Sequence, residues 1–283
     1  MTKFRALLIA AASLTALSGH SAMAAPAKTI VLVHGAFADG SGWKPVADIL
    51  IKDGYKVAIV QQPMTSLEDD VAATSRVLDR QDGPVVLVAH SYGGAIITEA
   101  GNDSKVTALV YVAAFAPEAG EALGALLQKT PSASTGIAPS KDGFLFLDPA
   151  VYAADFAGDL PKAEGEFLAL SQMPVAAKAF GTPITQPAWK AKPTFAIVST
   201  QDRMINPDLE RSMYQRAKAH VTEIKASHAV FLSQPRAVAK DRGGCTLRRL
   251  NTRPQPDEQR FVGLPPLTLS PSGRRAQEGA ALG

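Results

Sequence analysis

A serine stands at the junction between an apolar segment and a helix-like segment of this 283-residue chain. Ser91 closely follows the apolar run Val85–Val88, and the small residues Ala89 and Gly93 flank it on either side. A sharp strand-to-helix turn needs small neighbours, because its central residue adopts strained backbone angles. The hydroxyl then projects from the sheet, and the helix N-terminus offers N–H groups to a developing oxyanion. The pattern indicates a nucleophile; the alternative is a serine that only caps a helix.

A serine hydroxyl is a weak nucleophile without a base, and the chain contains five histidines. Four of these histidines have positions that indicate a role other than that of the base: His20, His34, His90 and His220. His220 is expected to end a helix, where a cation suits the helix dipole. His228 follows the last expected strand, at the edge where a parallel sheet gathers its functional loops. His228 is therefore the predicted base, although any single histidine can also be a packed or surface residue.

The third member of such an arrangement is a carboxylate that orients the histidine. Asp202 follows the apolar run Phe195–Val198, and it would accept a hydrogen bond from His228 and fix its tautomer. The chain order Ser91, Asp202, His228 is one in which such triads occur. Asp208 is the rival, but it lies at a helix start, where an acidic cap is the simpler explanation.

A tetrahedral intermediate needs two N–H donors for its oxyanion. The amide of Tyr92, directly after the serine, is the first predicted donor. Gly35 follows the first expected strand and lets the backbone approach closely, so that the amide of Ala36 or Phe37 would be the second. Phe37 and Met204 are also predicted to line a substrate pocket.

Short apolar runs alternate with helix-like stretches along the middle of the chain, and this order predicts a mostly parallel sheet with helices on both faces. The expected strands are 29–33, 56–60, 85–88, 106–112, 195–198 and 221–224, and the expected helices begin at Trp43, Ser66, Tyr92 and Pro207. Residues 117–191 carry no convincing buried strand. We interpret this insertion as a cap over the functional edge; the alternative is a decoration on the solvent side.

Both ends of the chain differ from the domain predicted over residues 25–240. Lys3 and Arg5 precede the apolar run Ala6–Leu17 and the small-residue site Ala22–Ala24. This order predicts a signal peptide over residues 1–24 and export to the periplasm or the medium; the alternative is a buried N-terminal helix. Residues 241–283 contain seven Arg, no Lys, five Pro and six Gly. They are predicted to be a disordered tail outside the fold, or else a basic segment that binds a partner.

The composition excludes several classes of function. The 29 basic against 26 acidic residues give a net charge of +3, too small to predict nucleic-acid binding. The single cysteine, Cys245, argues against a Cys-ligated metal site, and the sequence has no phosphate loop, dinucleotide fingerprint or metal-type spacing. No segment after the leader is long and apolar enough to span a membrane. We therefore expect an enzyme without cofactor or metal that acts on a small molecule.

The sequence resembles the α/β-hydrolases, and more narrowly the bacterial proteins grouped with plant methyl-ester esterases and hydroxynitrile lyases. The resemblance covers about residues 28–238 and is carried by four segments: Val31–Trp43, Asp82–Gly94, Ala100–Asp103 and Asp202–Glu210. It implies an α/β-hydrolase fold with a small helical cap and the same triad. Ala89 stands where the family usually has the first glycine of its nucleophile motif.

The resemblance implies hydrolysis of a small or medium carboxylic ester through an acyl-enzyme. The plant cyanohydrin-cleaving relatives carry Thr where this chain has Gly35, and Lys where it has Ala229. Both departures favour ester hydrolysis over lyase chemistry. Epoxide hydrolases and haloalkane dehalogenases share the fold but use an Asp nucleophile, so Ser91 argues against both. A lyase-like activity and a ligand-binding protein with a vestigial triad remain the alternatives.

Overall fold

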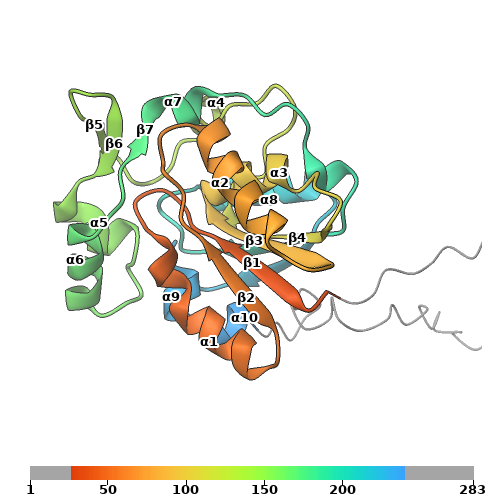
Figure 1. The fold of residues 1–283 in the computed structure, drawn as a ribbon. Helices are drawn as coiled ribbons and strands as arrows, with labels where there is room; N and C mark the ends of the chain where they lie inside the picture. Colours follow the sequence, from red (N-terminus) through yellow and green to blue (C-terminus); the bar gives the residue numbers. More distant parts are fainter. Residues whose placement is uncertain (1–26, 240–283) are drawn as a thin grey trace, which may run out of the picture. The chain divides into compact units, whose positions relative to one another are not determined.

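The computed structural model describes residues 27–239, which form a six-stranded parallel sheet with helices on both faces and a cap (Figure 1). The sheet order is β2-β1-β3-β4-β8-β9. Its strands are β1 (Thr29–Val33), β2 (Lys56–Val60), β3 (Val85–Ser91), β4 (Val106–Ala114), β8 (Thr194–Ser199) and β9 (His220–Ile224). This confirms the predicted α/β-hydrolase fold. The predicted signal peptide, the predicted tail and Cys245 lie outside the described residues.

The centre of the sheet is apolar on both faces, as a parallel sheet between two helical layers requires. All seven residues of β3 are buried, and so are all five of β1. These strands were expected from their continuous Val, Leu and Ile runs. Parallel pairing aligns the carboxyl ends of β1, β3, β4 and β8 at one edge, and the loops after these strands therefore meet there.

Helices cover the two faces of the sheet in separate groups (Figure 1). On one face, α1 (Lys44–Lys52) follows a 3₁₀ turn, η1 (Gly40–Trp43), and packs against α9 (Val230–Ser233) and α10 (Pro235–Ala239). On the other face lie α2 (Leu67–Asp79), α3 (Gly93–Ala100) and α8 (Pro207–Arg216). The side chain of Tyr111 in β4 contacts this second layer, because its hydroxyl bonds Thr98 of α3 and its ring lies 6.2 Å from that of Tyr214 in α8.

Two local expectations have different outcomes. The helix expected to begin at Ser66 is α2, and Ser66 caps it, since its side chain accepts the Asp69 N–H at 3.1 Å. His220 does not end a helix: it is the first residue of β9, and its ring stacks on Phe195 of the neighbouring strand at 5.2 Å. The helix α8 ends at Arg216, and Lys218 takes a positive φ of 51°, which turns the chain into the strand.

The insertion between β4 and β8 is a cap that contains both helices and strands. Its helices are α4 (Leu123–Lys129), α5 (Pro149–Asp155), α6 (Lys162–Leu170), α7 (Ala177–Gly181) and the 3₁₀ turn η2 (Ala188–Lys190). An antiparallel sheet of β5 (Ile137–Pro139), β6 (Phe144–Leu147) and β7 (Val175–Ala176) joins them. The sequence indicates no convincing buried strand here, and β5 and β6 are indeed largely accessible; strands of two to four residues leave no readable alternation, so the sequence does not predict this small sheet.

The cap lies over the carboxyl edge of the main sheet and is tied to its loops. The Phe37 N–H, after β1, donates to the Met173 carbonyl at 3.1 Å, and the Ala176 N–H donates to the carbonyl of Met64, after β2, at 2.8 Å. The Ser134 N–H donates to the carbonyl of Arg203, after β8. Between residues 27 and 239, no helix has the length and apolar character needed to cross a membrane.

Candidate active site

Ser91 lies at the corner between β3 and α3, in a strained conformation. Its φ is +53°, in the left-handed region that a residue with a side chain rarely adopts. The neighbours leave no room for larger groups: a Cβ at Gly93 would lie 2.6 Å from the His34 carbonyl oxygen. A Cβ at Gly35 would lie 2.6 Å from the Ser91 Cβ. The two glycines thus allow the loop after β1 to press against the serine.

His228 and Asp202 complete a hydrogen-bonded series with this serine. His228 Nε2 lies 2.9 Å from Ser91 Oγ, and His228 Nδ1 lies 2.6 Å from Asp202 Oδ2. The second carboxylate oxygen, Asp202 Oδ1, accepts the N–H groups of Met204 and Ile205 at 2.7 and 2.9 Å. The three side chains predicted from the sequence are therefore brought together and buried, and Asp202 has three donors around its charge.

Aromatic rings and a second histidine surround His228. The His90 Nε2–H donates to the His228 carbonyl oxygen at 3.0 Å, and the two rings lie 4.4 Å apart. Burial, and then the nearby His228, hold the pKa of His90 well below its usual value, so His90 is neutral at physiological pH. Phe156 of the cap meets the His228 ring edge-on at 4.9 Å. His90 therefore fixes the backbone of the predicted base, as its position before Ser91 allows.

The predicted oxyanion donors differ in their availability. Among the turn and loop hydrogen bonds of residues 27–239, the N–H groups of Tyr92 and Ala36 donate to no other residue. Phe37, with a φ of +61°, instead gives its N–H to Met173 of the cap. Since Gly35 holds this loop against Ser91, the arrangement favours Ala36 over Phe37 as the second donor.

A buried aspartate, absent from the sequence-based site, holds the side chain of Tyr92. The Tyr92 hydroxyl donates to Asp70 Oδ2 at 2.6 Å, and the Met64 N–H donates to Asp70 Oδ1 at 2.8 Å. Burial raises the pKa of Asp70 to about 6, although both hydrogen bonds oppose that shift. Asp70 lies on the buried face of α2 with Ala73 and Thr74. An acidic residue on that otherwise uncharged face is the sequence feature that indicates a buried partner.

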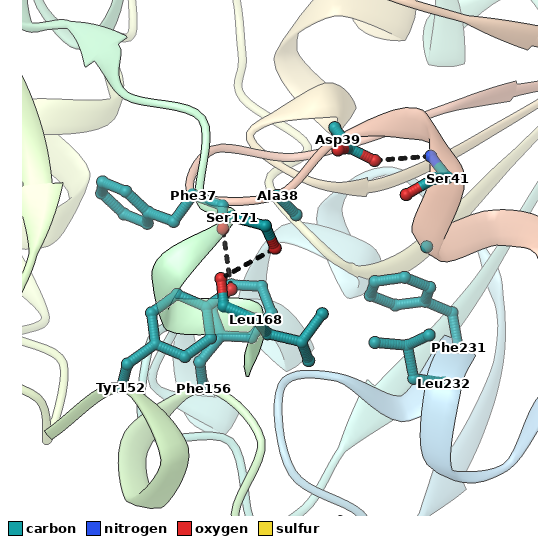
Figure 2. Close-up of a pocket in the computed structure, with 11 residues that line it drawn as sticks. Phe37, Ala38, Asp39, Ser41, Tyr152, Phe156, Leu168, Ser171, Phe231 and Leu232 are labelled. Carbon is teal, nitrogen blue, oxygen red and sulfur yellow. Dashed lines mark hydrogen bonds between the residues drawn. The ribbon is translucent and has the colours of Figure 1, made fainter. Parts of the chain in front are cut away.

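A small cavity lies between the loop after β1, the cap and α9 (Figure 2). Its volume is about 30 Å³, room for one water-sized group. Phe37 lines this cavity and Met204 does not, and their predicted place in a substrate pocket stays a prediction. Its other walls include Tyr152, whose hydroxyl donates to the Phe37 carbonyl at 2.7 Å, and Leu168. The cap aromatics therefore reach this side of the site, and the backbone N–H of Met204 donates to Asp202.

The rival carboxylate has an ordinary role on the surface. Asp208 lies in the first turn of α8 and pairs with Arg211 at 2.7 Å, while Asn206 caps the helix. Within the described part of the chain, no group of three or more His, Cys, Asp or Glu side chains could hold a metal ion.

Comparison with known proteins gives a consistent result. A family model described as the alpha/beta hydrolase family matches residues 30–241. A carbendazim hydrolyzing esterase of Nocardioides sp. (strain SG-4G) is 34% identical over 113 residues, which are 35% of this chain and 47% of that protein. The chain thus aligns with about half of that relative.

Two longer matches extend over most of the described residues. A pyrethroid hydrolase of Sphingobium wenxiniae is 26% identical over 242 residues, 75% of this chain and 85% of that protein. A solved structure of polyneuridine aldehyde esterase has a TM-score of 0.63 at 20% identity, and the match covers 75% of this chain and 96% of that one. At that identity the structural likeness shows the fold alone.

Proposed function

Because this chain belongs to the alpha/beta hydrolase family, we propose that it is a serine esterase that hydrolyses small or medium carboxylic esters. One observation carries the proposal: an uninterrupted, buried hydrogen-bond series runs from Ser91 Oγ through His228 to Asp202. The names of the relatives, an esterase and a hydrolase, support the same class of reaction.

The first half of the reaction transfers the acyl group to the serine. Ser91 Oγ attacks the ester carbonyl carbon while His228 Nε2 takes the hydroxyl proton. Asp202 accepts from Nδ1–H, which holds the tautomer and stabilises the imidazolium as it forms. The amides of Tyr92 and Ala36 hold the oxyanion of the tetrahedral intermediate. Its collapse breaks the ester C–O bond, and His228 returns the proton to the departing alcohol.

The second half releases the acid. Water gives a proton to His228 Nε2 and attacks the acyl carbonyl, and the second tetrahedral intermediate uses the same two amides. Collapse returns the proton to Ser91 Oγ and frees the carboxylic acid. Each half starts and ends with neutral His228, so no external proton carrier or cofactor enters the cycle.

The surroundings of the site favour hydrolysis over lyase chemistry. Ala229, next to the base, is fully buried, and its N–H donates to the Phe156 carbonyl at 3.0 Å. No cationic side chain therefore follows His228 to hold a leaving anion such as cyanide. A Cβ at Gly35 would collide with Ser91, so a threonine at that position would displace the nucleophile.

A fluorophosphonate probe tests the proposal without a guess about the substrate. We expect mass spectrometry of the treated protein to find the adduct on Ser91, and a panel of esters to be hydrolysed. Ser91→Ala should lose the adduct and at least ~1,000-fold of the turnover. Ser212→Ala is the matched control, because within the described residues that hydroxyl bonds only the Leu209 carbonyl of its own helix.

The alternative outcomes separate the rival functions. A folded protein that takes no adduct but releases cyanide from a mandelonitrile-type substrate would be a lyase. Ligand binding without adduct or turnover would indicate a vestigial triad. Either result would overturn the esterase proposal.

We also propose that the protein is exported, with cleavage after Ala24. The support is the order of basic, apolar and small-residue segments in residues 1–24. N-terminal sequencing of protein recovered from the periplasm or medium should begin at Ala25. A cytoplasmic product that keeps Met1 or begins at Thr2 would contradict it.

A further inference from the structure

Glu210 is a fully buried carboxyl group that the mechanism above does not use. It lies near the start of α8, where an acidic residue usually faces solvent and the helix dipole. Here it points inward: Oε2 accepts the Ser199 N–H at 3.3 Å, and no N–H or hydroxyl of the described residues donates to Oε1. A buried carboxylate with one long hydrogen bond is costly, so the charge of this group needs an explanation.

The group next to Glu210 is the triad carboxylate. Ser199 links the two acids, because its N–H donates to Glu210 Oε2 at 3.3 Å and its carbonyl accepts the Asp202 N–H at 3.0 Å. The interactions that raise the pKa of Glu210 include a side-chain hydrogen bond with Asp202. Two carboxyl oxygens can share a hydrogen bond only when one of them carries a proton, and two buried negative charges in contact repel strongly. One of the two acids is therefore neutral.

The hydrogen bonds decide which acid keeps the proton. Asp202 receives two backbone N–H groups and His228, all at 2.9 Å or less. Glu210 receives one backbone N–H at a longer distance. Three strong donors favour the charged form of Asp202, and the proton belongs on Glu210.

The charged and titratable neighbours reinforce this assignment. Arg211 on the same helix turns away, with its guanidinium on Asp208 and Glu223 at 2.7 Å. The Tyr214 hydroxyl is engaged with Ala114 of β4. On the far side of His228 stands the neutral His90. Burial, and next the charge of Asp202, raise the pKa of Glu210 well above its usual value.

We propose that protonated Glu210 is a positioning residue that donates an O–H hydrogen bond to Asp202 and so limits the negative charge that Asp202 presents to His228. The role in catalysis rests on the esterase function proposed above. The bond helps to hold the Asp202 carboxylate in the plane that His228 needs. Without this bond, the Asp202 carboxylate would stabilise the imidazolium of His228 more strongly. With the bond, the imidazolium is less stable, so that His228 stays neutral and able to act as base at lower pH.

Two variants give different expectations for one measurement, the acid limb of the pH profile of kcat/KM. Glu210→Gln keeps an N–H donor toward Asp202 and should leave the limb in place. Glu210→Leu removes the donor, increases the charge felt by His228, and should move the limb up by about one pH unit, the size expected when a charge-assisted hydrogen bond is lost. Asp208→Asn, an exposed carboxyl two residues away, is the control and should leave the limb unmoved.

Other results would overturn the proposal. If Glu210 were ionised, Glu210→Gln would remove a negative charge and move the limb down. If Glu210→Leu folds and its limb stays in place, Glu210 only fills space. Should Glu210→Leu fail to fold, the infrared carbonyl band of a protonated carboxyl group decides: at about pH 8, where Asp70 with its pKa of about 6 is ionised, the band should be present in the wild type and absent from Glu210→Gln.

The failure of the esterase function is distinguishable from the failure of this proposal. If the folded wild-type protein hydrolyses no ester and takes no fluorophosphonate, the function fails. The infrared band and an NMR titration of His228 still compare the same variants without turnover. An unchanged titration in Glu210→Leu would then reject the proposal on its own.

Discussion

Two buried aspartates are linked to the nucleophile corner, one through His228 and one through Tyr92, and their surroundings differ. Asp202, after β8, accepts two backbone N–H groups and reaches Ser91 through His228. Asp70, in α2, accepts one backbone N–H and the hydroxyl of Tyr92. Asp202 contacts the imidazole of His228, which can take up and release a proton. Asp70 contacts the phenol of Tyr92, whose own pKa is raised by burial, so that it keeps its proton.

The difference shows that the partner, and not burial, decides what a buried carboxylate does. Asp202 is linked to the side chains that would move protons. Asp70 is linked to the residue whose amide would hold the oxyanion, and through Met64 to the cap, because the Met64 carbonyl accepts from Ala176. We therefore expect Asp202 to control rate and Asp70 to control stability.

Replacing Asp202 tests the first half of this comparison and has the largest expected effect. Asp202→Asn keeps an oxygen for the two backbone donors but offers an N–H to His228, which favours the wrong tautomer. We expect kcat/KM to fall by ~10³–10⁴, with little change in melting temperature. A loss below about tenfold would mean that Asp202 does not orient the base.

The pH dependence of stability tests the second half. The folded-state pKa of Asp70 is about 6, above the ordinary 3.8, because of burial. The folded protein therefore holds this proton more tightly, and its contribution to stability is fully present below pH 3.8 and lost as the pH rises through 6. The shift corresponds to about 2–3 kcal/mol.

Asp70→Asn should remove that dependence. Urea unfolding at about pH 4.5 and 7.5 measures the difference between wild type and variant at each pH, and the variant should gain relative stability at the higher value. If the difference in unfolding free energy between wild type and variant were the same at both pH values, Asp70 would not titrate as described.

A third aspartate sets the scale for both effects. Asp208 has an 81% exposed side chain and pairs with Arg211, which also binds Glu223. Asp208→Asn should change the unfolding free energy by less than about 0.5 kcal/mol and leave kcat/KM unchanged. A clear loss of activity would revive Asp208 as a candidate acid and weaken the assignment of Asp202.

The predictable parts of the molecule are those encoded by contiguous residues. The apolar runs of β1 and β3 identify a doubly covered sheet, and the small residues around Ser91 identify the corner. His228 follows from elimination and from its place after the last strand. Ser66, the N-cap residue, predicts the start of α2. In each case a short stretch of sequence carries the whole signal.

The remaining parts depend on contacts between distant residues. Asp70 and Tyr92 are 22 positions apart, and nothing local to either shows the bond. The Phe37 amide is engaged by Met173 of the cap, which a sequence motif cannot show. Glu210 and Asp70 do share one readable feature: each is an acid within the buried face of an otherwise apolar or neutral helix stripe. A buried acid in such a stripe therefore indicates a partner of the site, and this rule identifies Glu210 and Asp70.

The crowding at three glycines limits how this enzyme could be altered. A Cβ at Gly35 would strike Ser91, one at Gly93 would strike the His34 carbonyl, and one at Gly94 would overlap the Phe115 carbonyl. Every base change that turns a glycine codon into that of another amino acid adds a Cβ. Random libraries will therefore lose most clones mutated at these codons, and diversity intended to change substrate preference is better directed to the cap wall at Leu168 and Ser171.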